Sequence, residues 1–308
     1  MQNAEEKKKV IVLLSTYNGE KYVEAQIESI LNQTYPNIEI YIRDDGSKDH
    51  TKDVLKKYET NERVHIEYGE NVGFIKNFFW LVKNSGEAEY YAYADQDDVW
   101  FPKKIEMAME KLEEEKTGDI PMLYFSNYDF YDGDLNFMAH NKVVQIKPSF
   151  QNALMDCMPL GFNTVFNKKT CEIMRANIPE CSCGHDWWTY MVCAGMGKVV
   201  YDKRPTVKYR RHNNNVSAGG MSFLKFQVWR FKKFFKNHYF ANIHEQLKEY
   251  ERLYGSKLNE EDRKILSLFT RDGYHFVNAM KKAFHSGKYR QRTIDELMVR
   301  VLCIIGKL

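Results

Sequence analysis

The sequence predicts an α/β protein: a mostly parallel sheet flanked by helices, followed by a helical C-terminal extension. Short apolar runs alternate with stretches of helical periodicity from about residue 10 to residue 116, which is the order expected of a doubly wound sheet. Polar clusters follow several of the predicted strands directly. From about Gly219 the composition shifts to long helical patterns. We therefore expect a catalytic domain over residues 1–218 and a helical region over residues 219–308.

Composition narrows the class of protein. The chain has 308 residues, of which 44% are hydrophobic, so it has room for a substantial core. A formal charge of +3 gives no global reason to expect nucleic-acid binding. Six cysteines show no regular framework, which favours free thiols in a reducing compartment. The apolar run over residues 10–14 is too short for a signal peptide or a membrane span. We expect a cytoplasmic protein that touches a membrane at most peripherally.

The expected elements follow from the period of the apolar residues. The run over residues 10–14 is apolar throughout and β-branched at several positions, as in a strand that is buried on both faces. Helical spacing over about residues 20–32 ends before Pro36. Further strands are expected at 38–42, 64–68, 90–94, 122–125, 159–166, 199–201 and 206–209, and further helices at about 49–58, from 74, 103–116, 184–194, 243–254, 259–270 and 293–305.

Polar side chains follow three of the predicted strands, in residues 15–18, 44–47 and 95–98. In open parallel sheets, ligands bind beyond the carboxyl ends of the strands. The third cluster places the carboxylates of Asp95, Asp97 and Asp98 within four residues. Three such charges repel one another unless a cation lies among them, and oxygen ligands suit Mg²⁺ or Mn²⁺ with positions left for phosphate oxygens. An acidic turn in solvent is the alternative; three clusters of this kind favour the cation site.

The order of six short motifs resembles the inverting family 2 glycosyltransferases of the GT-A fold. The Asp-Gln-Asp-Asp-Val-Trp run and the Arg-His-Asn-Asn-Asn-Val-Ser run look most like the bacterial rhamnosyltransferase branch, which is similar to enzymes using dTDP-L-rhamnose in cell-wall polysaccharide synthesis. The motifs that carry the resemblance are Ser15-Thr16-Tyr17-Asn18, Asp44-Asp45-Gly46-Ser47, Asn71-Val72-Gly73, Asp95-Gln96-Asp97-Asp98, His185-Asp186 and Arg211-His212.

The resemblance implies where the nucleoside of a nucleotide-sugar donor binds. Ser15, Tyr17 and Asn18 match the loop that contacts the base and ribose, and Tyr17 either stacks on the base or is a buried tyrosine. Asp45 matches the acid that accepts a hydrogen bond from the pyrimidine N3–H. Because thymine and uracil both carry that group, Asp45 cannot distinguish dTDP from UDP. Asn71 and Gly73 belong to the same donor-binding set.

The resemblance also implies how the diphosphate is held. Asp97 matches the direct ligand of a divalent cation, Mg²⁺ or Mn²⁺. Asp95 and Gln96 match donor-binding positions, and Asp98 departs from the barest form of the motif. Arg211 and His212 would donate to the diphosphate, with His212 also a possible metal ligand. A bound dication and these donors stabilise the negative charge that develops on the leaving group.

Asp186 matches the general base of the family. Inverting displacement needs a base on the face opposite the leaving group to take the proton of the acceptor hydroxyl. The alternative is that Asp186 caps a helix, since aspartate is a good N-cap residue, and both roles are compatible. Trp187 and Trp188 either offer flat faces to an acceptor sugar or pack in the core.

Two C-terminal segments have an apolar face whose packing partner the sequence does not identify. Residues 223–236 are basic, aromatic and helical in period, which suits either an interfacial membrane helix or a helix packed on the catalytic domain. The predicted helix at 293–305 has an apolar stripe that fits docking or homodimerisation. Membrane contact would suit an acceptor saccharide that is linked to a lipid.

These observations give a metal-dependent inverting glycosyltransferase as the leading hypothesis, with dTDP-L-rhamnose as the donor of L-rhamnose and a lipid-linked saccharide as the acceptor. A UDP-hexose-dependent member of the same family is one alternative. A non-catalytic protein that binds sugar nucleotides or glycans is another, against which the intact Asp97 and Asp186 argue.

Overall fold

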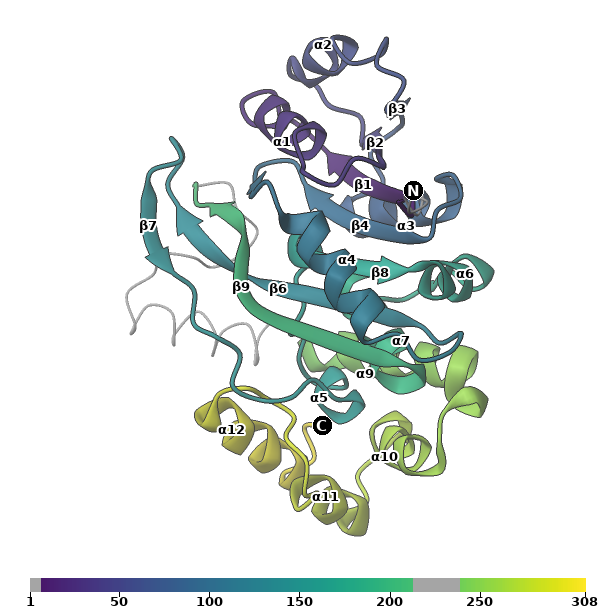
Figure 1. Ribbon diagram of the computed structural model, residues 1–308. Helices are drawn as coiled ribbons and strands as arrows, with labels where there is room; N and C mark the ends of the chain where they lie inside the picture. The colour runs from purple at the N-terminus through teal and green to yellow at the C-terminus, as the bar shows by residue number, and fades with distance from the viewer. Residues whose placement is uncertain (1–6, 213–238) are drawn as a thin grey trace. The chain divides into compact units, whose positions relative to one another are not determined.

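A computed structural model describes residues 7–212 and 239–308 of the chain (Figure 1). The chain forms two compact units. The sequence predicted one boundary, after residue 218, and that position lies outside the described residues. Two segments from within the predicted catalytic domain, and its last residues from Arg211 on, belong to the second unit. Unit 1 comprises Met1–Val143, Pro159–Ile178 and Gly197–Arg210, and unit 2 comprises Val144–Met158, Pro179–Met196 and Arg211–Leu308.

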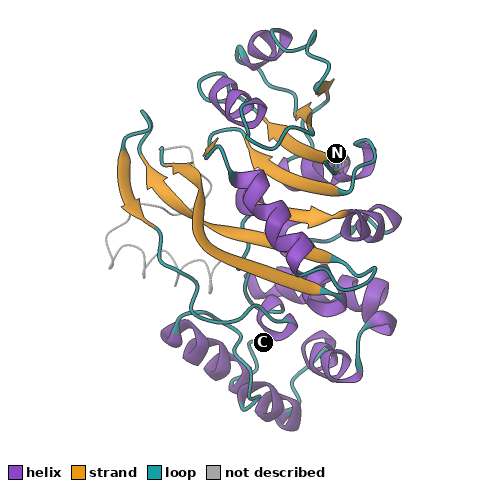
Figure 2. Ribbon diagram, in the orientation of Figure 1, coloured by secondary structure: helices purple, strands orange, loops and turns teal. Residues whose placement is uncertain are grey.

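Unit 1 contains a nine-stranded sheet with the order β3-β2-β1-β4-β8-β6-β9-β5, and β7 pairs with β6 (Figure 2). The first four strands in that order are parallel, as predicted. The second half is mixed, because β8 runs antiparallel to both β4 and β6 while β6 and β9 are parallel. The strands are β1 (Val10–Thr16), β2 (Ile38–Asp44), β3 (Val64–Tyr68), β4 (Tyr90–Asp95), β5 (Val99–Trp100), β6 (Met122–Tyr131), β7 (Phe137–His140), β8 (Thr164–Asn167) and β9 (Lys198–Arg210).

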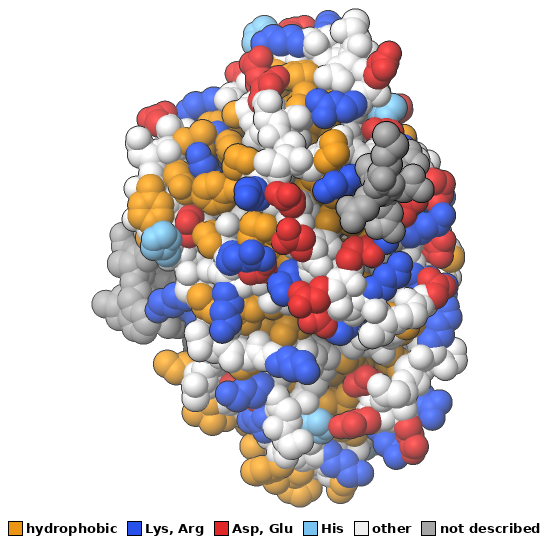
Figure 3. All heavy atoms as spheres, in the orientation of Figure 1, with side chains coloured by type: hydrophobic (Ala, Val, Ile, Leu, Met, Phe, Trp, Pro, Cys, Tyr) orange, Lys and Arg blue, Asp and Glu red, His pale blue; other side chains and the backbone are white. Residues whose placement is uncertain are grey.

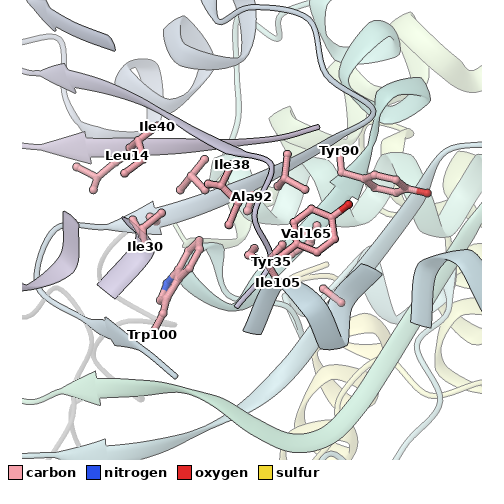
Figure 4. Packing of buried hydrophobic residues seen from close by; sticks show 14 of the residues in the cluster. Leu14, Ile30, Tyr35, Ile38, Ile40, Tyr90, Ala92, Trp100, Ile105 and Val165 are labelled. Carbon is pink, nitrogen blue, oxygen red and sulfur yellow. The ribbon is translucent and has the colours of Figure 1, made fainter. Parts of the chain in front are cut away.

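The central strands are buried on both faces because helices cover both. Side chains alternate along β1, so Val10, Val12 and Leu14 point to one face and Ile11 and Leu13 to the other. Figure 4 shows part of the first face, where strand residues pack with side chains of α1 (Val23–Leu31) and α4 (Lys104–Glu114). α3 (Phe74–Asn84) and α6 (Lys168–Ala176) contact the sheet as well as each other.

Most elements of the first half lie where the apolar period predicted them, including α2 (Thr51–Lys56). The second half departs from the prediction. The expected strands at 199–201 and 206–209 are one strand, β9, whose register against β6 shifts near Asn127. The helix α6 and the short strands β5 and β7 were not predicted.

Unit 2 is helical in the residues that the structure describes. Its core contains Trp188 and Tyr250, whose rings meet edge to face at 5.7 Å, and the Tyr250 hydroxyl donates to the carbonyl of Met191 at 3.0 Å. Asn259 caps α10 by accepting from the backbone N–H of Asp262, as predicted. The helices are α5 (Phe150–Ala153), α7 (His185–Met196), α9 (Tyr239–Tyr254), α10 (Glu260–Thr270), α11 (Phe276–Ala283) and α12 (Thr293–Ile304).

Two expectations for the C-terminal region meet different outcomes. The basic aromatic segment at 223–236 lies outside the described residues. The final predicted helix at 293–305 is present as α12. Across residues 7–212 and 239–308, no helix combines the length and the apolar character needed to cross a bilayer.

Candidate active site

A buried polar network joins the ends of β1 and β2. The Arg43 guanidinium donates to the Asp45 carboxylate at 2.7 Å and also to the side-chain oxygen of Asn77. The amide nitrogen of Asn77 donates to the hydroxyl of Ser15 at 2.6 Å. Arg43, Asp45 and Asn77 are all buried, which makes their mutual hydrogen bonds necessary. Sequence reasoning identified Ser15 and Asp45 but missed Arg43 and Asn77, although an arginine inside an apolar strand was a signal.

Asp45 fastens the loop that begins α3. Its two carboxylate oxygens accept the backbone N–H groups of Val72 at 3.0 Å and of Gly73 at 2.9 Å. Gly73 has a φ of +85°, a conformation that glycine adopts without strain. Asn71 is exposed beside it. That Asp45 accepts a hydrogen bond from a pyrimidine N3–H stays a prediction. The bonds from the two backbone N–H groups fix the orientation of its carboxylate.

The loop after β1 presents one aromatic ring to solvent. Tyr17 is 41% exposed, so the buried alternative for this tyrosine is wrong. Asn18 adopts a φ of +48°, and its N–H donates to the hydroxyl of Ser47 at 2.8 Å. The side-chain oxygen of Asn18 accepts the N–H of Lys48 at 2.9 Å. Asn18 therefore ties the first polar cluster to the second.

Gln96 ties the same loop to the acidic turn, residues 95–98. Its side-chain oxygen accepts the Thr16 hydroxyl at 2.7 Å and the Tyr17 N–H at 2.8 Å, and its amide nitrogen donates to the Tyr17 carbonyl at 3.1 Å. A Cβ on Gly19 would lie 2.2 Å from that oxygen, so a larger residue at position 19 would displace the Gln96 amide. The middle residue of the acidic motif thus positions Tyr17.

The acidic turn is layered by burial. Asp95 and Asp97 are half-buried, whereas Asp98 is fully buried. Burial, followed by the charges of Asp97 and Asp95, raises the pKa of Asp98 well above its ordinary value. Lys104 is also fully buried, and its Nζ lies 4.7 Å from the centre of the Trp100 ring without a hydrogen bond. Burial lowers the pKa of Lys104 to about 7.

Arg210, the last residue of β9, holds this turn. Its backbone N–H donates to Asp98 Oδ1 at 3.1 Å, and its Nε donates to the carbonyl of Asp97 at 2.8 Å. The guanidinium also donates to the Gly133 carbonyl at 2.6 Å and lies 4.7 Å from the Tyr22 ring centre. Sequence reasoning named the two residues that follow and missed Arg210 itself.

The residues of the turn fit a divalent cation that arrives with a diphosphate. Two half-buried carboxylates, Asp95 and Asp97, follow the carboxyl end of β4, and Mg²⁺ is often held by one or two carboxylates, substrate phosphates and water. Among the described residues, no group of three or more His, Cys, Asp or Glu side chains forms a complete metal site. The donor set therefore suits a shared ion and not a protein cage.

Unit 2 carries the remaining predicted site residues. Asp186 lies in the first turn of α7, and its Oδ1 accepts the N–H of Trp187 at 2.8 Å, so it bonds to the helix end while remaining half-exposed. Trp187 and Trp188 are buried, which is the packing alternative. The indole N–H of Trp187 donates to the Ala153 carbonyl at 2.6 Å. His185 beside them is buried, and burial lowers its pKa to about 4.

The structure thus brings together the polar groups that follow β1, β2 and β4 in unit 1. Arg211 and His212 are half-buried and belong to unit 2 with Asp186. A cavity of about 370 Å³ in unit 2 contains none of the predicted site residues. It is lined mainly by residues of α9, α10 and α11 and of the chain between them.

Comparison with known proteins gives the family context. The model of the family "Glycosyl transferase family 2" matches residues 11–172. The chain is 30% identical over 221 residues to the dTDP-rhamnosyl transferase RfbG of Shigella flexneri, covering 68% of this chain and 75% of that protein. It is 26% identical over 231 residues to TuaG of Bacillus subtilis, a putative teichuronic acid biosynthesis glycosyltransferase, covering 71% and 85%.

Solved structures agree on the fold. TarS of S. aureus in complex with UDP-GlcNAc superposes with a TM-score of 0.54 at 15% identity, covering 85% of this chain and 79% of that one. The mannosyltransferase PcManGT of Pyrobaculum calidifontis, in complex with GDP-Man and Mn²⁺, gives 0.51 at 13% identity, covering 97% and 75%. At these identities the likeness is one of fold, and that fold is GT-A.

Proposed function

The chain belongs to glycosyl transferase family 2, and on that premise we propose that it moves L-rhamnose from dTDP-L-rhamnose to a saccharide acceptor in cell-wall polysaccharide synthesis. The observation that carries the proposal is the pair Asp95 and Asp97 at the carboxyl end of β4, joined through Gln96 to the loop of Tyr17. The similarity to RfbG favours the rhamnosyl donor, and the similarity to TuaG favours the polysaccharide role.

The donor nucleoside would lie at the network side of the site. The exposed ring of Tyr17 is available for stacking on a base. Ser15, Asn18, Asn71 and Gly73 lie in or beside the loops that Asp45 and Ser47 hold by hydrogen bonds. Asp45 would accept from the pyrimidine N3–H. Because both pyrimidine nucleotides satisfy that contact, a UDP-hexose donor is the second candidate within the family.

The diphosphate would meet the acidic turn. Asp97, with Asp95 and with His212, would hold Mg²⁺ or Mn²⁺. Such an ion, when bound, stabilises the negative charge that develops on the departing nucleoside diphosphate. Arg211 and His212 would donate to the same oxygens. Asp98, anchored to the N–H of Arg210, keeps the turn in place behind them.

Asp186 would act as the general base. Its carboxylate is half-exposed, and the hydrogen bond from the Trp187 N–H fixes its orientation at the start of α7. In direct displacement with inversion, it would remove the proton of the acceptor hydroxyl, and a positioned base of this kind contributes about 10²–10⁴-fold. Both tryptophans are buried. Trp187 and Trp188 would therefore influence an acceptor only indirectly, by supporting the surface residues next to them.

A panel of sugar nucleotides, each with Mn²⁺, Mg²⁺ or a chelator, tests the proposal by the release of nucleoside diphosphate. We expect turnover of dTDP-L-rhamnose that the chelator abolishes. Turnover of a UDP-hexose with dTDP-L-rhamnose inert would replace the donor. Binding without release from every donor would favour the non-catalytic alternative.

Asp186→Asn separates binding from chemistry, because asparagine keeps the shape of the side chain but takes up no proton at neutral pH. We expect donor affinity within twofold of the wild type and a transfer rate lower by about 10²–10⁴-fold, measured with a soluble acceptor. The exposed helix-start residue Glu260→Gln on α10 is the matched control. Near-normal transfer by Asp186→Asn would remove it as the base.

A further inference from the structure

The hairpin of α11 and α12 exposes its apolar side chains. Of the fifteen large hydrophobic side chains that are exposed among the described residues, nine lie between residues 274 and 305. In Figure 3 hydrophobic side chains gather over the part of unit 2 that these two helices form. The nine are Tyr274, Phe276, Val277, Phe284, Ile294, Leu297, Val301, Ile304 and Ile305.

Two charged side chains of the same hairpin, Glu296 and Arg300, are turned inward. Glu296 is 9% exposed, and its carboxylate accepts the N–H groups of Tyr289 and Arg290 at 2.8 Å. Arg300 donates to the carbonyls of Ala283 and Gly287, both at 2.7 Å. These bonds lock the connection between the helices. A surface helix in water shows the opposite distribution, with the charges outside.

On α12 the outward face is apolar after the exposed Thr293 at its first position. From residue 294 to residue 305, every exposed side chain is apolar, and positions 294, 297, 301 and 304 recur at intervals of three and four. The inward face is apolar too, since Val299, Leu302 and Cys303 are buried. α12 therefore buries one apolar stripe and exposes another, while its charged residues Asp295, Glu296 and Arg300 are buried or half-buried.

The two exposed faces adjoin. The Tyr274 hydroxyl, just before α11, donates to the Ile304 carbonyl near the end of α12 at 3.0 Å. The helices therefore run antiparallel, and their aromatic and aliphatic side chains form one surface, which we call the hairpin face. A contiguous apolar surface of this kind marks an interaction site.

The exposed charges within the hairpin itself have one sign. Within residues 274–308 the exposed charged side chains are Lys281, Lys288, Arg292 and Lys307, all positive. The two acids in this range do not oppose them at the surface, since Glu296 is buried and Asp295 is half-buried. Lys281 lies on the same stripe of α11 as Val277 and Phe284, four residues from one and three from the other.

We propose that the hairpin face of α11 and α12 is a surface that binds an anionic lipid bilayer. Aromatic and aliphatic side chains would enter the headgroup and acyl boundary, and the surrounding lysines and arginine would pair with lipid phosphates. A second copy of the chain is disfavoured, because a symmetric contact sets the same four cations against each other. The proposal deepens the proposed function, on which it rests for its purpose, by naming the surface that would meet a lipid-held acceptor.

The test uses the full chain and vesicles of phosphatidylcholine with or without phosphatidylglycerol. We expect flotation with the anionic vesicles only. The double variant Phe284→Glu with Leu297→Glu should lose at least about 100-fold in vesicle affinity, and Lys281→Gln about fivefold at low salt. Phe284 and Leu297 are 71% and 64% exposed, so these changes leave the packed side of the helices intact.

The matched control is Phe137→Glu with Met138→Glu on β7, two apolar residues that are 51% and 54% exposed in unit 1. It should bind vesicles as the wild type does. Equal binding by the wild type and the Phe284/Leu297 variant would overturn the proposal, and a matched loss with Lys232, Lys233 and Lys236→Glu would then assign binding to residues 223–236.

A second copy as occupant would show itself differently. Light scattering would then find a wild-type dimer that the Phe284/Leu297 variant dissociates, with no vesicle binding, and that result would also overturn the proposal. Release of nucleoside diphosphate with a soluble acceptor should be the same in all these proteins. Failure of the proposed function would instead abolish release in the wild type while leaving vesicle binding unchanged.

Discussion

The two sides of the candidate site are built differently, although both follow strands of the same sheet. On the side of β1 and β2, Arg43, Asp45, Asn77 and Ser15 satisfy one another through short hydrogen bonds. At the acidic turn after β4, one oxygen of Asp98 and the Nζ of Lys104 are buried without a hydrogen-bond partner. On the first side the Asp45 carboxylate is paired with the Arg43 guanidinium, although the Nε of Arg43 is also buried without a hydrogen-bond partner. The second stores electrostatic cost, which a cation near Asp95 and Asp97 would relieve.

The comparison predicts the largest effect for a change at the acidic turn itself. Asp97→Asn removes a carboxylate while keeping its shape, and we expect nucleoside diphosphate release to fall by about 10²–10³-fold. Thermal stability should be equal or higher, because the change removes a charge that acts on Asp98. The exposed Asp134→Asn, in the turn after β6, is the control. If both variants turn over equally fast, the turn holds no charge important for the reaction.

The network side predicts the reverse pattern, a loss of stability. Asn77→Leu keeps the branched shape of the side chain but leaves hydrogen-bonding groups of Arg43 and Ser15 without their buried partner. We expect the free energy of unfolding in urea to fall by about 3 kcal/mol, since each stranded buried group costs roughly 1–3 kcal/mol. Asn84→Leu, at the exposed end of the same helix, should change it little. Equal losses in the two variants would mean that this network is no more sensitive than the surface.

The buried lysine behind the acidic turn predicts a gain. Lys104→Met removes a desolvated amine, and we expect the free energy of unfolding at pH 7 to rise by about 1–3 kcal/mol. The folded pKa of Lys104, about 7, lies below the ordinary 10.5, so the unfolded chain binds more protons between these values. Wild-type stability should therefore rise from pH 7 toward pH 10.

The difference between the pH slopes of the wild type and Lys104→Met isolates this lysine, and the exposed Lys103→Met should leave the slope unchanged. Identical slopes for the wild type and Lys104→Met would show that Lys104 keeps its proton in the folded protein.

The smallest loss of stability is expected at the start of α3, where Asp45 holds the loop of Gly73. Gly73→Ala places a Cβ in open space, so its cost comes from the positive φ alone and should be about 1–2 kcal/mol. Gly118→Ala, with a φ of +68° and equally open surroundings, should cost the same. Donor affinity should fall only for Gly73→Ala, as measured by calorimetry. A matching fall for Gly118→Ala would break the link between the Asp45 loop and the donor.

The sequence predicted the parallel half of the sheet, from β3 to β4, correctly. β1 and β4 follow continuous apolar runs, which are diagnostic because helices cover both faces, and β2 is marked by the alternating Ile38, Ile40 and Ile42. β9 was divided in two because Asp202, Lys203 and Arg204 interrupt its apolar pattern, while the Arg204 side chain folds back onto Asp202 at 2.6 Å. Local polarity there reflects an ion pair within one strand and not a break in the strand.

The sequence predicted the site residues that belong to recognisable motifs. It missed residues outside those motifs whose role depends on being buried. Asn77 falls in a helix among aromatic residues, and only the three-dimensional structure shows that it faces the network. Arg210 resembled an ordinary basic residue before the Arg211-His212 pair. Lys104 looked like a solvated lysine at a helix start, but it is fully buried.

Arg210 also closes unit 1, because the next residue, Arg211, belongs to unit 2. Consecutive Cα atoms lie about 3.8 Å apart across a trans peptide bond. The backbone of Arg211 therefore starts one peptide bond away from a residue whose N–H and Nε hold the Asp98 carboxylate and the Asp97 carbonyl. Covalent connectivity alone thus brings a second arginine to the acidic turn, where the diphosphate is proposed to bind.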